Sequence, residues 1–158
     1  MKKSLFVFVL SFILYISCDD IFPGLTFTGI TETNIDGEIL SSDPSDWNLT
    51  DDWNRRENNL FEEGFEDICE NSPHFIVSAY PNPCTEVLHV NLPSSDSTRT
   101  AIRIVKSNFE VLISLDSVPG CLLINFRDFD LQGEIVRIYY KILGENCEYR
   151  GHGDIQIN

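Results

Sequence analysis

Acidic side chains in the first half of this 158-residue chain are the residues whose types and spacing could do chemistry. Asp43, Asp46, Asp51 and Asp52 are candidate ligands of Ca²⁺, a hard cation that is bound by oxygen atoms alone. They lack the D-x-D-x-D-G spacing of a calcium-binding loop. We therefore predict a solvated acidic loop, with no bound metal ion and no other cofactor.

Paired carboxylates also carry out glycoside hydrolysis, in which they flank the scissile bond. The pairs Glu62–Glu63 and Asp51–Asp52 are adjacent in the chain, and adjacent carboxylates need a cleft to reach both sides of a substrate. The sequence has no G-x-S-x-G, H-E-x-x-H, P-loop or G-x-G-x-x-G motif. Trp47 and Trp53 offer aromatic faces to a sugar ring, but we expect them to cover the edge of a small domain. We predict a protein that is not an enzyme.

The charge of the chain excludes one class of partner. It has 25 acidic and 11 basic residues, a net charge of −14, so it lacks the basic surface that binds nucleic acid. Fifteen of the acidic residues lie between Asp19 and Ser72, beside only two arginines. A stretch this acidic stays solvated unless cations or a packed scaffold hold it.

Residues 1–17 have the pattern of an export signal. Lys2 and Lys3 precede an apolar stretch from Leu5 to Ile16, which is shorter than the roughly 20 residues of a membrane-spanning helix. The segment Tyr15-Ile16-Ser17-Cys18 resembles the lipobox of bacterial lipoprotein signal peptides. This resemblance implies cleavage before Cys18, acylation of Cys18 with chains such as palmitate, and a membrane anchor.

Asp19 and Asp20, directly after Cys18, resemble two different sorting signals. One retains enterobacterial lipoproteins at the inner membrane, and the other exports lipoproteins of Bacteroidota to the cell surface. The rest of the chain favours the second signal.

Cys69, Cys84, Cys121 and Cys147 make an even number of cysteines in a chain that leaves the cytoplasm. An oxidising compartment then favours two disulfides, with three connectivities that the sequence cannot rank. A zinc site is disfavoured because no C-x-x-C pair is present.

Hydrophobic periodicity divides the chain into an acidic region, residues 18–72, and a region of strands, residues 73–158. In the first region Asp36-Gly37 predicts a hairpin within Leu25–Leu40, and Leu60, Phe61, Phe65 and Ile68 have the spacing of a short helix. In the second region apolar residues alternate with polar ones, which predicts half-buried strands of an antiparallel sandwich. The alternating segments are Val87–Leu92, Ile102–Ile104, Ile124–Phe126, Val136–Ile142 and Ile155–Ile157.

Tyr80-Pro81-Asn82-Pro83 and the strand that follows it resemble the start of the C-terminal sorting domain of type IX secretion substrates in Bacteroidota. The resemblance covers about residues 75–158. It implies an immunoglobulin-like β-sandwich, and it implies secretion machinery as a partner.

We expect a cell-envelope lipoprotein at the outer membrane or cell surface, which acts as a non-catalytic binding or structural module. Its partners are then the membrane, through the N-terminal lipid, and other envelope proteins. The alternative is a secreted protein whose C-terminal domain is a type IX sorting signal. We favour the first because the acidic region is short for an exported passenger.

Overall fold

The protein is mainly β. The structure, a computed structural model, describes residues 24–27, 29–49, 52–61, 68–69, 76–93, 99–144 and 146–158. In chain order its elements are β1 (Glu32–Thr33), β2 (Ile39–Ser41), α2 (Arg55–Asn58), β3 (Ser78–Tyr80), β4 (Val87–Asn91), β5 (Arg99–Val105), β6 (Val111–Val118), β7 (Cys121–Asn125), β8 (Ile135–Leu143) and β9 (Glu148–Gln156).

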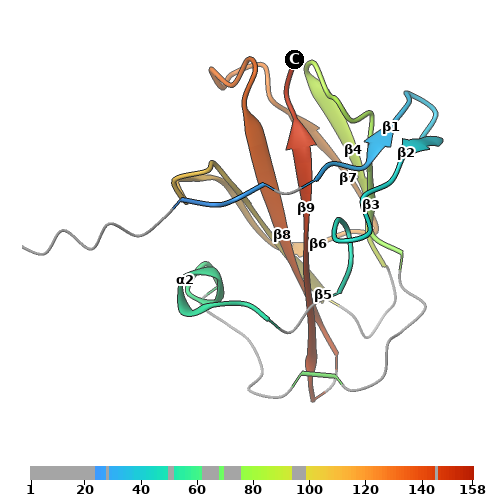
Figure 1. The fold of residues 1–158 in the computed structure, drawn as a ribbon. Coiled ribbons are helices and arrows are strands. Elements are labelled where there is room, and N and C mark those ends of the chain that lie inside the picture. Colours follow the sequence, from blue (N-terminus) through green and yellow to red (C-terminus); the bar gives the residue numbers. More distant parts are fainter. Residues whose placement is uncertain are drawn as a thin grey trace, which may run out of the picture.

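Two antiparallel sheets form the predicted sandwich. One has the strand order β3-β4-β7 and the other has the order β6-β5-β8-β9, so the chain changes sheet three times, after β4, β6 and β7 (Figure 1). A third, small sheet is the β1–β2 hairpin. The mainly β fold class and the antiparallel pairing predicted from the alternation are confirmed.

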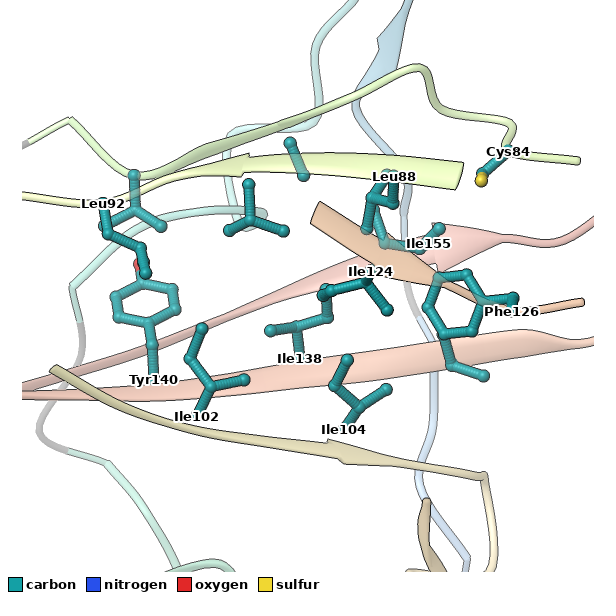
Figure 2. Packing of buried hydrophobic residues seen from close by; sticks show 14 of the residues in the cluster. Cys84, Leu88, Leu92, Ile102, Ile104, Ile124, Phe126, Ile138, Tyr140 and Ile155 are labelled. Atoms are coloured by element: carbon teal, nitrogen blue, oxygen red, sulfur yellow. The ribbon is translucent and has the colours of Figure 1, made fainter. Parts of the chain in front are cut away.

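The core fills the space between the two main sheets. Leu88 and Ile124 of the three-stranded sheet face Ile102, Ile138 and Ile155 of the four-stranded sheet (Figure 2). Each of these side chains is almost fully buried, and burying one contributes roughly 1.5–3 kcal/mol to stability. Successive strand residues point to opposite faces, which explains why the alternating residues meet here.

The predicted hairpin is present, and glycine is needed at its turn. Gly37 has a φ of +81°, a left-handed conformation that other residues adopt only with strain. The Asn34 side chain accepts hydrogen bonds from the amides of Asp36 and Glu38, at 3.0 and 2.9 Å. These bonds hold the chain in the turn.

The predicted helix within residues 53–69 is a single turn, α2. Asn54 begins it with a capping box, in which its side chain accepts from the Glu57 amide and the Glu57 carboxylate accepts from the Asn54 amide. The helix ends before Leu60. Phe65, which we placed in the same helix, lies outside the described residues.

The outer edge of β9 is covered by three separate segments. The amide of Cys69 donates to Glu148, the amide of Trp47 donates to His152, and the amide of Cys84 donates to Gln156, each through the backbone carbonyl. An uncovered strand edge is a template for pairing with another chain. This edge of the sheet is therefore already used within the protein.

The prediction of half-buried strands is wrong for part of the four-stranded sheet. Arg137, Tyr139 and Lys141 on β8 and Arg103 on β5 point away from the core, yet all four are buried. The reason is that the acidic region lies over them: Thr26, Glu57 and Leu60 accept hydrogen bonds from these side chains. The two regions that composition separated are thus packed against each other.

Candidate functional site

We call the outward side of β5, β8 and β9, together with the residues of the acidic region that contact these strands (24–27, 46–49 and 52–61), the covered face. It holds most of the buried ionisable groups of the described chain. From the sheet these are Arg103, Arg137, Lys141, Glu148 and Asp154, and from the acidic region they are Asp46 and Glu57. Burying a charge is costly unless it is paired and hydrogen-bonded. Each group therefore needs a partner at short range.

Arg137 and Asp154 form a two-point ion pair across β8 and β9, which place them opposite each other. The guanidinium nitrogens lie 2.6 and 2.7 Å from the two carboxylate oxygens. Burial disfavours the guanidinium charge, but Asp154 outweighs it and the pKa of Arg137 is raised. Arg137 also donates to the carbonyl of Thr26 at 3.3 Å. The pair thus ties the start of the acidic region to the sheet.

Asp46 has a structural role and does not belong to the solvated loop that we predicted. Its two carboxylate oxygens accept from the amides of Thr31 and Asp154, both at 2.8 Å. Burial raises the pKa of Asp46 and the two amides partly offset this effect. Burial of the Asp46 carboxylate is tolerated because it accepts hydrogen bonds from two buried backbone amides that would otherwise have no partner.

Of the other three calcium candidates, Asp43 and Asp52 form no metal site with Asp46. Asp43 accepts from the amide and the hydroxyl of Ser45, and these hydrogen bonds lower its pKa. Asp52 is exposed, and Asp51 lies outside the described residues. Within the described part of the chain, no three acidic, histidine or cysteine side chains are placed to hold a metal ion.

Glu57 and the aromatic residues beside it close the centre of the covered face. The carboxylate of Glu57 accepts from the Tyr139 hydroxyl at 2.7 Å, and burial together with this bond raises the pKa of Tyr139. Trp53 lies edge-on to Tyr139 and stacks on Phe61, with both ring separations 5.4 Å. Trp47 stacks on Tyr140 at 6.3 Å. Both tryptophans cover the sandwich, as expected, and form no exposed platform for a sugar.

A group of basic side chains lies at one end of the covered face. Buried Glu148 contacts Lys141 at 3.3 Å and also accepts from Arg150. Burial lowers the pKa of Lys141. Arg103 donates to Asp116 at 2.8 Å and to the carbonyl of Leu60 at 2.9 Å. Each of these cations has an acidic or carbonyl partner within the protein.

A cavity of about 240 Å³ lies beside this basic group. Arg99, Arg103, Ser114, Asp116 and Ser117 supply polar groups to its lining, and Phe61 and Leu143 supply apolar ones. This volume is below the roughly 300–1,000 Å³ of ligand-binding pockets in general.

Two buried polar atoms at the covered face have no hydrogen-bond partner among the described residues. They are Nε1 of Trp53 and Nδ1 of His152. Burial lowers the pKa of His152, and the nearby charge of Arg137 lowers it further, against the opposing charges of Asp154 and Glu57. The lowered pKa of His152 favours its neutral form.

The cysteines form one disulfide instead of the two that we predicted. Cys69 and Cys147 are bonded, with their Cα atoms 5.1 Å apart. Cys84 and Cys121 are free. Cys121 lies opposite Asn91 at one end of β4, whereas Cys84 precedes the other end, at Val87. This separation exceeds the roughly 7 Å that a disulfide can span between Cα atoms.

The side chain of Asn82, in the Tyr80-Pro81-Asn82-Pro83 motif, forms hydrogen bonds to the last strand, β9. It is fully buried, and its side chain donates to the carbonyls of Thr31 and Asp154, both at 2.9 Å, and accepts from the amide of Gln156 at 3.0 Å. Tyr80 stacks on His89 across the neighbouring strand. The motif thus links the acidic region, β3 and β9.

Sequence reasoning missed Glu57, Arg137 and Asp154 as the groups that join the two regions. One signal was present for Glu57, because Asn54-x-x-Glu57 has the spacing of a capping box.

Cys18, the predicted lipidation site, lies outside the described residues. Comparison of the chain with protein families, curated proteins and solved structures gives no match.

Proposed function

We propose that the protein is a lipid-anchored, non-catalytic binding or structural module of the bacterial cell envelope. One observation carries this proposal: the chain that follows the lipobox-like segment is built into the sandwich. Residues 24–61 supply Asp46 and Glu57 to the covered face, and Cys69 is bonded to Cys147 in the last hairpin. An anchor at Cys18 would therefore hold the whole domain.

The distance along the chain supports a position close to the membrane. Gly24, the first described residue, is six residues after Cys18. Six extended residues span at most about 20 Å. No helix of the described residues is long and apolar enough to cross a bilayer. Attachment in this proposal therefore depends on the acylated cysteine.

The strand orders support an immunoglobulin-like sandwich. In that fold strands A, B and E share one sheet and strands C, F and G share the other, with an added C′ strand beside C in some members. Here β3, β4 and β7 correspond to A, B and E, while β5, β8 and β9 correspond to C, F and G, and β6 takes the place of C′. Such sandwiches present loops and faces that serve for binding.

The use of the buried ionisable groups supports a non-catalytic role. The Arg137–Asp154 pair, Asp46 and Glu57 each join the acidic region to the sheet. Holding two regions together accounts for their burial without a reaction.

Membrane partitioning of Cys18→Ser tests the proposal. We expect wild type to be recovered with membranes and the variant in the soluble fraction, with the intact mass of wild type showing cleavage before Cys18 and added acyl chains. Cys121→Ser is the control, and it should remain membrane-bound. Membrane recovery of Cys18→Ser equal to that of wild type would contradict the lipid anchor.

The alternative, a type IX sorting domain that is removed after export, gives a different result. Peptide mapping of cell-associated protein should then lose residues 136–158 and keep residues 24–61. In our proposal both sets persist. Because Cys69 is bonded to Cys147, the mapping is done after reduction, so that a cut between them separates the two parts.

A further inference from the structure

Basic side chains are concentrated around Ala101, at one end of the covered face. Arg99 and Arg103 stand two residues to either side of Ala101 on β5, so all three point to the same face of the sheet. Lys141 lies opposite Ala101 on β8, and Arg150 lies opposite Lys141 on β9. Four of the 11 lysines and arginines of this acidic chain therefore lie in three neighbouring rows of one sheet.

Arg99 differs from its basic neighbours in having no partner among the described residues. Asp116 pairs with Arg103 at 2.8 Å, and Glu148 contacts Lys141 at 3.3 Å. Arg99 is exposed and forms no salt bridge or hydrogen bond with any residue that the structure describes. Its guanidinium keeps a permanent positive charge and a planar fork of N–H donors. These donors are available to a molecule from solution.

The cavity of about 240 Å³ described above opens beside Arg99. Ser114 and Ser117 on β6 contribute hydroxyl groups to its lining, and Phe61 and Leu143 contribute apolar surface. Positive charge, hydroxyl groups and apolar surface thus meet in one small space. Because the cavity is smaller than ligand-binding pockets in general, it selects a ligand of few atoms.

We propose that this cavity is a binding site for a small carboxylate that carries a short apolar group. The carboxylate accepts hydrogen bonds from Arg99, whose two parallel donors match the two carboxylate oxygens. The hydroxyl groups of Ser114 and Ser117 supply further donors. The apolar group of the ligand lies against Phe61 and Leu143.

The charges around the cavity favour an anion over a cation or a neutral molecule. Asp116 is the one acidic residue among the described residues of the lining, and its charge is balanced by Arg103. A cation would be repelled by Arg99, and a neutral molecule would leave Arg99 without a counter-charge. The net charge of −14 does not prevent the approach of an anion, because charges more than about 8–10 Å apart are largely screened at physiological ionic strength.

Titration of the full chain, purified in mild detergent, with butyrate tests the proposal. Butyrate has a carboxylate and a short apolar chain, and butyramide has nearly the same shape without the charge. By calorimetry we expect saturable binding of butyrate with a Kd of about 1 mM, as befits a ligand of so few atoms. Butyramide should bind at least about tenfold more weakly. In NMR spectra butyrate should shift the amide signals of Arg99, Ser114 and Ser117.

Arginine variants separate this cavity from a general effect of positive charge. Arg99→Gln should weaken butyrate binding about tenfold or more, because it removes both the charge and the paired donors. Arg99→Lys keeps the charge without the planar fork, so its affinity should lie between those of wild type and Arg99→Gln. Arg55→Gln is the control: it removes the same charge from an exposed position on α2 that does not line the cavity. It should bind butyrate as wild type does.

Four outcomes would overturn the proposal. Three are an absence of saturable butyrate binding up to about 50 mM, equal binding of butyramide, and wild-type affinity in Arg99→Gln. The fourth concerns the chain's own carboxylates, since Glu62 and Glu63 directly follow Phe61 in the sequence. Butyrate binding that appears only in a Glu62→Gln, Glu63→Gln double variant would mean that these side chains exclude an external ligand. None of these results bears on the lipid anchor, which Cys18→Ser tests separately.

Discussion

Replacement of Asp46 tests whether a buried carboxylate joins the two regions. Asp46→Ala leaves the amides of Thr31 and Asp154, each 2.8 Å from a carboxylate oxygen, without an acceptor. A buried donor without a partner costs about 1–3 kcal/mol. With two such donors, we expect the free energy of unfolding to fall by about 2–6 kcal/mol. Asp46→Asn keeps one acceptor oxygen and should lose about half as much.

Urea unfolding followed by tryptophan fluorescence measures this loss, because Trp47 and Trp53 both lie against the sheet. Asp36→Ala, an exposed change in the hairpin turn, is the control and should stay within about 0.5 kcal/mol of wild type. A loss below about 1 kcal/mol in Asp46→Ala would refute the reasoning. If added Ca²⁺ stabilised wild type but not Asp46→Ala, that result would instead support calcium binding at Asp46.

Three further predictions concern the disulfide, a glycine and a histidine. Removal of the Cys69–Cys147 bond by a double serine variant opens a loop of 78 residues, so calorimetry should show a loss of about 4–5 kcal/mol; a loss below about 1 kcal/mol would show that the bond does not constrain the unfolded chain. Gly153→Ala places a methyl group against the Trp47 ring, and urea unfolding should show a destabilisation of about 1–3 kcal/mol; wild-type stability would mean that the ring moves freely. His152 has a lowered pKa, so the unfolded chain binds its proton more readily. The contribution of neutral His152 to stability is complete above about pH 6.5 and is lost as the pH falls below that value. A His152→Gln variant should lose this part of the pH dependence. A urea midpoint that depends on pH in the variant as it does in wild type would contradict this prediction.

The alternation of apolar residues was enough to predict the sandwich, because it depends on which side of a strand each residue faces. It was not enough to predict what covers the outer side of β8. The run from Ile135 to Leu143 includes Tyr139 among the outward positions, and a strand buried on both faces tends to be apolar throughout. That signal was weakened by Arg137 and Lys141. Their partners are distant in the chain, so no local pattern could identify them.

The cysteines show the same limit. An even count in an exported chain favours pairing, but the register of β4 and β7 places Cys84 and Cys121 at opposite ends of the sheet. Register depends on the whole fold, so spacing alone could not exclude that pair. Asp46 was misjudged for a related reason: local composition predicts solvation, whereas its partner, the Asp154 amide, lies 108 residues away.

The covered edge of β9 has a consequence for the order in which the protein folds. Its partners at residues 47, 69 and 84 all precede β9 in the chain. None of them can reach its final place until the last strand has been made and has paired with β8. Contacts between such distant residues slow folding. These three segments therefore take their final places late in folding, only after the C-terminal residues are present.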